Sequence, residues 1–277
     1  MQVVFADSCS VPGLGIGTYR MGESARLREQ EVATLQLAID AGVRVIDTAE
    51  MYADGGAETV VGMALRGDRR DKAFVVTKVL PSNAGRRRVV AACERSLARL
   101  RTDRIDLYLL HWRGSIPLAE TLAGFEQLMR DGKIRHYGVS NFDRADMAEW
   151  VALKGGESVA ADQVLYNLSR RGPEWDLLPW CRERGIAIMA YTPLGQGSLL
   201  RDRTLADIAR RRNATPAQVA LAWLLRQEGM IVIPKAAHLE HVRDNRGALN
   251  VVLTEEDLSA LDRAFPPPKG KSSLGML

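Results

Sequence analysis

Cysteine and histidine are scarce in this sequence. Its 277 residues include three cysteines and four histidines. The cysteines, Cys9, Cys93 and Cys181, are widely spaced and form no CxxC pair. This spacing matches neither a disulfide framework nor a local zinc motif. We therefore expect reduced, packed thiols and no metal site.

Long apolar runs are missing as well. No stretch approaches the roughly 18 consecutive apolar residues that indicate a transmembrane helix. Residues 1–7 lack the basic region and apolar core of a signal peptide. These absences predict a cytoplasmic protein without a membrane partner.

Lysine is much rarer than arginine, with 7 Lys against 31 Arg. The formal net charge of the chain is +4. Two arginine clusters, at 86–88 and 210–212, have no aromatic residues interleaved. Nucleic-acid modules show more organised basic surfaces, so we interpret the clusters as solvated helix ends and predict no nucleic-acid partner. Because lysine is rare, Lys78 at the end of an apolar run suggests a site that needs a compact ammonium group.

The sequence is rich in alternation. Apolar runs of strand length recur eight times, with helical periodicity between them. The runs cover 14–17, 45–48, 74–78, 105–111, 137–140, 160–166, 187–191 and 230–234. The helical segments cover 31–40, 86–100, 118–131, 176–184 and 204–212. Eight such units in about 250 residues predict an α/β protein, a (β/α)8 TIM barrel formed by residues 1–277 as a single domain.

Further segments extend this barrel. Residues 3–5 and 10–11 are expected to form an N-terminal hairpin across the barrel bottom. Two extra helices are also predicted. The first lies before the last strand and begins with a capping box of Thr215 and Gln218, with Pro216 at the first helical position. The second covers residues 254–265. Residues 266–277 are a short C-terminal tail.

A doubly wound dinucleotide-binding fold is the alternative, suggested by glycines at 13, 15 and 17. However, Arg20 stands at the third glycine position of the fingerprint, and no helical pattern follows directly. The acidic residue expected about 20 positions later is also missing. We interpret the glycines instead as places where the backbone passes close to a ligand at the barrel mouth.

Three predicted strands end on an ionisable residue, namely Asp47, Lys78 and His111, and Tyr52 follows five residues after Asp47. The C-terminal strand ends of a barrel converge on one face, so these four side chains should share a pocket. A Lys78 ammonium would lower the pKa of Tyr52, Asp47 would hold the lysine, and a neutral His111 would orient a carbonyl. Each residue taken singly has an ordinary structural explanation, but their joint placement favours an acid catalyst.

With the neighbouring motifs, these residues resemble the aldo-keto reductases, which are nicotinamide-dependent oxidoreductases on a (β/α)8 barrel. The resemblance extends from the glycines at 15 and 17 through Lys78 and Leu110-His111-Trp112 to Ile233-Pro234-Lys235. It implies reduction of aldehydes or ketones to alcohols by hydride from the nicotinamide C4. Tyr52 would be the general acid, tuned by Lys78 and Asp47, and His111 would orient the carbonyl.

The resemblance also implies a site for NADPH, with NADH as the alternative cofactor. Gly17 and Thr18 would lie beside the nicotinamide ribose together with Asp47. Contacts to the nicotinamide are implied for Ser140, Asn141, Gln163 and Tyr191, to the pyrophosphate for Thr192, Leu194, Gly195 and Gly197, and to the adenosine end for Lys235, His241 and Asn245. Independently of the family, the apolar neighbours of Gln163 predict a buried hydrogen-bond partner for its amide.

Some positions depart from the family pattern. Ala236 and His241 stand where members often have Ser and Arg, with Arg243 as a candidate substitute. Because a bidentate guanidinium is lost, the preference for NADPH is less firmly implied. At the substrate pocket, expected to be lined by Tyr19, Tyr52, His111 and Trp112, Tyr19 replaces a frequent Trp.

The loop 111–118 and the tail are short, and both segments wall the pocket in relatives of narrow specificity. We therefore expect a shallow, open pocket for small or varied aldehydes. The pattern is most similar to bacterial members that reduce methylglyoxal.

Two other functions fit the same fold. One is a redox-sensing subunit that keeps its cofactor bound, and the other is alcohol oxidation in the cell. The intact set of Asp47, Tyr52, Lys78 and His111 favours turnover over sensing, while the direction of the reaction stays open. Because no apolar stripe is left unexplained by the barrel helices, we expect a monomer.

Overall fold

Eight parallel strands form a closed barrel at the centre of the computed structural model, which describes all residues from Met1 to Leu277. The strands are β3 (Gly15–Gly17), β4 (Val45–Asp47), β5 (Phe74–Val79), β6 (Ile105–Leu110), β7 (Ile134–Ser140), β8 (Ala161–Leu165), β9 (Ala187–Tyr191) and β10 (Met230–Ile233). Each strand pairs with its neighbour in sequence. Parallel bridges from Leu14 to Val232 and from Gly17 to Lys235 join the two ends. The predicted (β/α)8 barrel is confirmed, and the doubly wound alternative, which needs an open sheet, is wrong.

Gly17 lies where the barrel closes. Its N–H donates to the Pro234 carbonyl at 3.0 Å, and a Cβ at this position would lie 3.3 Å from the Ile233 carbonyl oxygen. A side chain here would crowd the backbone of β10, so close backbone approach favours glycine at this position.

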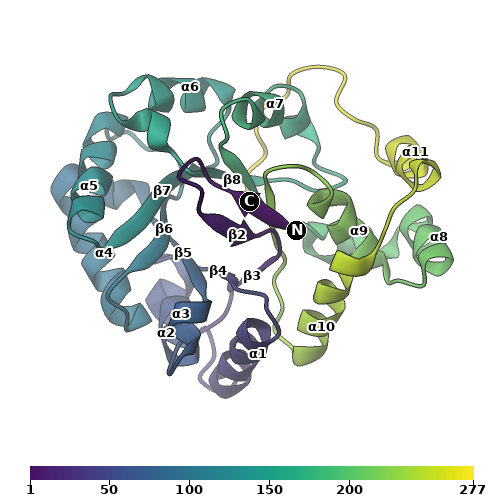
Figure 1. Cartoon of the computed structure of the whole chain (residues 1–277), viewed down its shortest axis with the longest axis horizontal. Coiled ribbons are helices and arrows are strands. Elements are labelled where there is room, and N and C mark those ends of the chain that lie inside the picture. Colours follow the sequence, from purple (N-terminus) through teal and green to yellow (C-terminus); the bar gives the residue numbers. More distant parts are fainter.

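A ring of helices surrounds the barrel (Figure 1). The helices that follow the eight strands are α1 (Arg28–Asp40), α2 (Gly56–Ala64), α4 (Arg86–Leu100), α5 (Leu118–Arg130), α6 (Arg144–Ala152), α7 (Leu177–Arg182), α8 (Arg203–Arg212) and α10 (Leu239–Gly247). A single turn, α3 (Arg69–Lys72), precedes β5. None of the helices has the length and apolarity needed to cross a bilayer.

The two extra helices are confirmed as α9 (Pro216–Leu225), before β10, and α11 (Glu255–Ala264), after α10. The capping box of α9 forms as expected: the Gln218 N–H donates to Thr215 Oγ1 at 3.2 Å, and the Thr215 N–H donates to Gln218 Oε1 at 3.1 Å. These reciprocal bonds satisfy two backbone donors that the helix start would otherwise leave unpaired.

The sequence pattern did not predict α2 and α6. Helix α6 buries only Met147 and Trp150, so its apolar periodicity is weak. Its start is held by Asp143, whose carboxylate accepts the N–H groups of Ala145 and Asp146 at 2.8 and 2.9 Å. A helix fixed by its cap and by the closing of the barrel leaves little hydrophobic pattern to detect.

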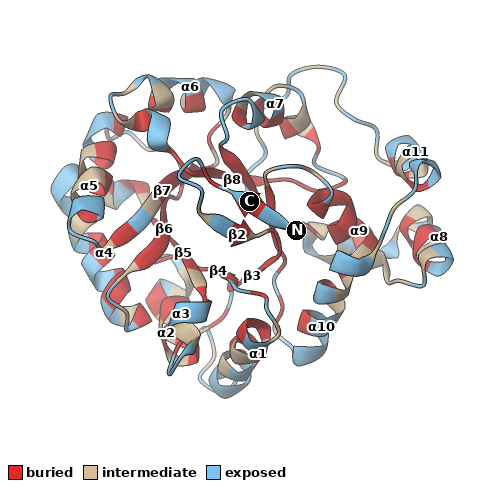
Figure 2. Ribbon diagram, viewed as in Figure 1, coloured by how far each residue is buried: buried red, intermediate tan, exposed pale blue.

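The barrel strands are mostly buried (Figure 2), and the core forms two layers, one on each face of these strands. The larger layer packs the outer faces of the strands against the helices. The smaller layer fills the barrel and includes Val3, Phe5 and Val11. These three residues belong to the N-terminal hairpin of β1 (Gln2–Val4) and β2 (Ser10–Pro12), which pair antiparallel. The predicted hairpin at the barrel bottom is confirmed, and its apolar side chains close the interior.

Candidate active site

The alternation of the strands points the candidate residues into the barrel. Side chains two positions apart on a strand share a face. Val45, Val76 and Leu109 lie in the interior core layer, and the residues two positions later are Asp47, Lys78 and His111. All three therefore point inwards at the C-terminal end of the barrel.

Lys78 connects the group. Its side chain is fully buried, and its Nζ donates to Asp47 Oδ2 and to the Thr48 carbonyl, both at 2.8 Å. The same Nζ lies 3.3 Å from the Tyr52 hydroxyl. Tyr52 opens the 3-10 turn Tyr52–Gly55, which lies in the loop after β4. The structure thus brings Asp47, Lys78 and Tyr52 into one hydrogen-bonded chain.

Burial and the Lys78 ammonium shift the pKa of Tyr52 in opposite directions. Burial raises the pKa of the phenol, and the Lys78 ammonium lowers it by less, so the net direction is upwards. The predicted lowering by Lys78 is therefore present, but burial of the ring, which the sequence did not indicate, outweighs it. The phenol stays protonated at neutral pH, which is the form that can donate a proton.

The charge of Lys78 is secured by its partners. Burial by itself would lower the pKa of the ammonium. Asp47, and after it Tyr52, raise this pKa by more than burial lowers it, so the net direction is upwards. A buried cation held at 2.8 Å from a carboxylate stays ionised. The lysine is thus a fixed positive charge beside the phenol.

His111 is neutral, as predicted. Burial, followed by the charge of Lys78, lowers its pKa to about 3. Its Nδ1 is buried without a hydrogen-bond partner. A neutral imidazole has one N–H, so it can donate a single hydrogen bond to a carbonyl oxygen without carrying a charge.

Aromatic rings line the mouth in a continuous row. The Tyr19 ring lies edge-on to the Tyr52 ring, with 5.4 Å between their centroids. The corresponding centroid distances are 5.8 Å from Tyr52 to His111 and 4.9 Å from His111 to Trp112. Tyr19 is 51% exposed, so the row reaches the surface. The four residues predicted for the substrate pocket are therefore neighbours.

A second hydrogen-bonded chain lies across the barrel mouth. The Tyr191 hydroxyl donates to Asn141 Oδ1 at 2.9 Å, Asn141 Nδ2 donates to Ser140 Oγ at 3.1 Å, and Ser140 Oγ donates to the Gln163 carbonyl at 2.8 Å. Asn141 adopts a left-handed conformation with φ of 60°. The three strand ends of β7, β8 and β9 thus present an ordered polar surface beside the aromatic row.

Gln163 joins the two chains. Its Nε2 donates to Asp47 Oδ1 at 2.7 Å, so the predicted buried partner of this amide is Asp47. Thr18 supports Asp47 from another side, since its hydroxyl donates to the Asp47 carbonyl at 3.0 Å. Thr18 is fully buried, so this hydroxyl is directed at the backbone and not at the open mouth.

The loop after β9, called here the cradle loop, turns through several residues with positive φ. Thr192, Gly195 and Gly197 have positive φ values of 52°, 58° and 88°. A Cβ on Gly195 would lie 2.8 Å from Ser198 Oγ, and this contact together with the positive φ favours glycine there. The N–H groups of Gly195 and Gly197 donate to the Thr192 and Leu194 carbonyls at 3.0 and 2.9 Å, so the loop is held as two successive turns. Leu194 precedes the 3-10 turn Gly195–Arg201 of the same loop.

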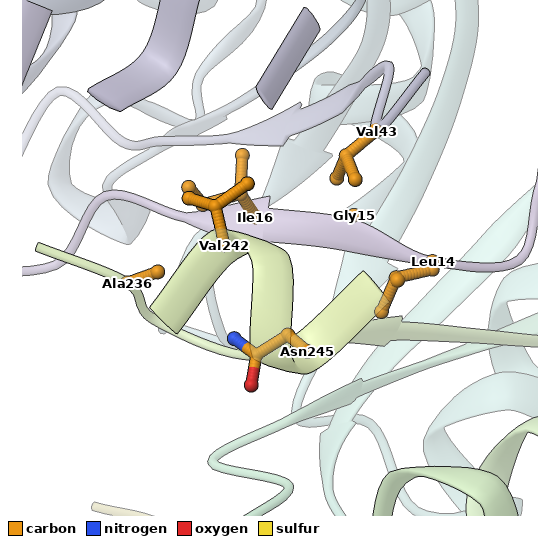
Figure 3. A pocket seen from close by; sticks show the side chains of 7 residues that line it. All are labelled: Leu14, Gly15, Ile16, Val43, Ala236, Val242 and Asn245. Atoms are coloured by element: carbon orange, nitrogen blue, oxygen red, sulfur yellow. The ribbon is translucent and has the colours of Figure 1, made fainter. Parts of the chain in front are cut away.

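The predicted adenosine contacts gather around α10. Lys235 follows β10 and is exposed, and His241 is exposed on α10. Asn245 lies on the buried side of that helix, beside a cavity of about 10 Å³ (Figure 3). Ala236 is 1% exposed and lines the same cavity with apolar residues. The methyl group of Ala236 therefore packs inwards, where it cannot replace a hydroxyl in binding a phosphate.

The short tail nevertheless reaches the mouth. Residues 266–277 leave α11 and return towards the barrel axis (Figure 1). Leu274 packs against the core, and a Cβ on Gly275 would lie 3.3 Å from Leu165. The backbone of Leu277 lies near the Tyr191 hydroxyl. The expected open pocket is thus partly covered, because the tail crosses the mouth directly.

Sequence reasoning missed two supporting residues. Glu50 is buried, and its Oε1 accepts the Leu80 N–H at 2.8 Å and Asn83 Nδ2 at 3.0 Å, which ties the loop after β4 to that after β5. Asn167 Nδ2 donates to the Thr192 carbonyl at 2.9 Å and fixes the start of the cradle loop. Both are polar residues just after a predicted strand, and that position was the available signal.

Comparison with known proteins gives a consistent result. A model described as the aldo/keto reductase family matches residues 13–265. Methylglyoxal reductase YeaE of Escherichia coli is 50% identical, and the alignment covers 100% of this chain and 99% of that protein. Glyoxal reductase of Bacillus subtilis is 34% identical over 92% of this chain and 90% of its own length. A Klebsiella pneumoniae aldo/keto reductase, solved with NADP and acetate, is 50% identical with a TM-score of 0.97, covering 100% of this chain and 99% of that one.

Proposed function

The chain belongs to the aldo/keto reductase family, and on this basis we propose that it reduces small 2-oxoaldehydes of the methylglyoxal type with NADPH. Its reaction class is NADPH-dependent reduction of a carbonyl group to an alcohol. The finer statement, the substrate, is supported by relatives named methylglyoxal and glyoxal reductase. Small dicarbonyls also suit a mouth that the tail partly covers.

The observation that carries the proposal is the chain Asp47–Lys78–Tyr52 beside neutral His111. Bound NADPH would supply the hydride. Tyr52 would hold the proton for the substrate oxygen, and its position 3.3 Å from the Lys78 ammonium favours transfer because the developing phenolate meets a fixed positive charge. Asp47 would keep that ammonium in place through the 2.8 Å bond. His111 would orient the carbonyl with its single N–H.

The residues present fit a nicotinamide dinucleotide. The polar surface of Ser140, Asn141 and Gln163 would bind the carboxamide, with Tyr191 beside the ring, and Asp47 would face the ribose. The cradle loop, with its positive φ values at Gly195 and Gly197, would cover the pyrophosphate. Lys235, His241 and Asn245 would hold the adenosine end.

The test is an assay of the purified protein with methylglyoxal. We expect NADPH to be oxidised, which is monitored as the loss of nicotinamide absorbance. The kcat/KM for methylglyoxal should be larger than that for a bulky aromatic ketone of equal reactivity. A matched tail deletion, ending at residue 265, should narrow this difference because the covering segment is gone. If methylglyoxal gives no turnover while simple aldehydes do, the proposed substrate class is wrong and the reaction class stands.

Lys235 provides the test of cofactor choice. Lys235→Ala should raise the KM for NADPH by about 10- to 100-fold and leave that for NADH nearly unchanged, because a hydrogen bond to a charged group contributes about 1.5–3 kcal/mol. Lys72→Ala is the matched control, since Lys72 is also a partly exposed lysine but precedes β5 at the opposite end of the barrel. An equal rise for both cofactors would rule out a role in binding the 2′-phosphate.

We further propose that the protein acts as a monomer in the cytoplasm and that reduction is the direction in the cell. The exposed large hydrophobic residues are scattered over the chain, from Met1 to Leu277, which supports a monomer.

A further inference from the structure

A cluster of metal-ligating side chains lies at the barrel bottom, at the end opposite the candidate active site. Asp7 and Cys9 belong to the turn of the N-terminal hairpin, and His136 belongs to the first half of β7. One ligand atom from each residue lies within 4.8 Å of the other two. These residue types are the ones that bind zinc in proteins. No part of the proposed reductase chemistry uses them.

The two ring nitrogens of His136 both face oxygen acceptors. Its Nδ1 lies 3.0 Å from the Asp106 carbonyl oxygen, and its Nε2 lies 2.8 Å from Asp7 Oδ2. Both neighbours are acceptors, yet a neutral imidazole has only one N–H. When Nδ1–H donates to the carbonyl, the Nε2 lone pair faces the Asp7 carboxylate. This contact is favourable only with a proton or a metal cation between the two atoms.

The surroundings hold the ligands in place. The Phe5 ring packs edge-on to His136 at 5.2 Å. In the turn, the Cys9 N–H donates to Asp7 Oδ1 at 3.0 Å, which leaves Asp7 Oδ2 for His136. A ligating histidine usually donates its other N–H to a carbonyl or carboxylate, and the Nδ1 contact with Asp106 has this geometry. The cluster therefore has both a ligand layer and a supporting layer.

Charge at the cluster is also suitable. Burial, followed by the carboxylates of Asp7 and Asp106, raises the pKa of Cys9, so the sulfur is a thiol in the metal-free protein. The arginines nearby are engaged, since Arg70 and Arg135 pair with Asp106 at 2.9 and 3.4 Å. A divalent cation would displace the thiol proton to solvent and reverse the repulsion that opposes the thiolate.

We propose that Asp7, Cys9 and His136 form a zinc site with one position left for water. Tetrahedral zinc places its ligand atoms about 3.3–3.7 Å apart, given bond lengths near 2.0–2.3 Å. Small rotations of two surface side chains bring the cluster to that spacing. The bound ion would link the hairpin, which closes the barrel bottom, to β7. The site is independent of the reductase reaction.

The test uses cobalt and zinc on the full, tag-free protein under reducing conditions. We expect one equivalent of Co²⁺ to produce a thiolate-to-cobalt charge-transfer band in the near ultraviolet, displaced by Zn²⁺. This band identifies the site because it requires an accessible thiolate, and Cys93 and Cys181 are fully buried. A surface pair such as His238 and His241, with ring centroids 5.3 Å apart, contains no sulfur and would give no such band. Cys9→Ser should abolish the band.

A second variant and a stability measurement make the result decisive. Asp7→Asn should weaken zinc binding by at least about 10-fold, since loss of even an outer-shell partner costs 10–100-fold. Zinc should raise the Tm of the wild-type protein and leave that of Cys9→Ser unchanged. Absence of the band in the wild-type protein, or equal zinc affinity in all three proteins, would overturn the proposal. None of these measurements needs turnover, so they do not depend on the proposed substrate.

Discussion

Replacing Tyr52 by Phe is expected to lower kcat for methylglyoxal reduction by about 100- to 10,000-fold, which is the usual contribution of a positioned general acid. The substitution removes the one hydroxyl that lies 3.3 Å from Lys78 Nζ and keeps the ring that packs against Tyr19 and His111. The Kd for NADPH, measured by fluorescence, should change little because the ring and its neighbours remain. The measurement is kcat, KM and the cofactor Kd of the purified variant.

Tyr19→Phe is the matched control for this variant. Tyr19 carries the same side chain in the same aromatic row, but it is half exposed and has no contact with Lys78. Its kcat should remain close to that of the wild-type protein. If Tyr52→Phe retained comparable turnover, the proton would have to come from another group, and the assignment of the general acid would fail.

Replacing Lys78 by Met is expected to remove both activity and a large part of the stability. Lys78 is fully buried and paired with buried Asp47, and breaking a buried ion pair from one side typically costs about 3–5 kcal/mol. Catalysis should fall at least as far as in Tyr52→Phe, because the phenolate would lose its fixed positive neighbour. The measurements are the free energy of unfolding in urea and kcat.

A double variant keeps this prediction testable if the single variant folds poorly. Lys78→Met combined with Asp47→Asn removes both charges, so no uncompensated carboxylate remains in the barrel. It should be more stable than Lys78→Met by itself and still be inactive. A double variant as unstable as the single one would show that the lost packing of the lysine, and not the orphaned charge, determines the cost.

The sequence was informative wherever a signal is local. Buried strands alternate strictly between two faces, so the ionisable residue at each strand end could be assigned to the interior from its position. This places Asp47, Lys78 and His111 at one end of the barrel before any coordinates are known. The capping box at Thr215 is equally local, because its partners are three residues apart. Helix α6 was missed because its amphipathic pattern is weak and its stability comes from its cap and from packing.

The pKa of Tyr52 shows what the sequence could not determine. The neighbouring lysine was identified correctly, but the net direction depends on how much water the whole mouth excludes. Burial is the sum of contacts from many segments and outweighs the single charge. The tail shows the same dependence, since its length is visible in the sequence but its path back to Tyr191 is not.

The barrel, its strand ends and the kind of chemistry they carry were thus determined by the sequence itself, because periodicity and strand position are properties of short segments. Only the tertiary structure decided which distant residues meet. Gln163 bonds Asp47 across 116 positions, and Asp7 meets His136 across 129. Such contacts arise because barrel closure brings β8 beside the inward residues of β4 and folds the hairpin under β7. No local pattern records that closure, and for this reason the spacing of the cysteines gave no indication of a cluster at Cys9.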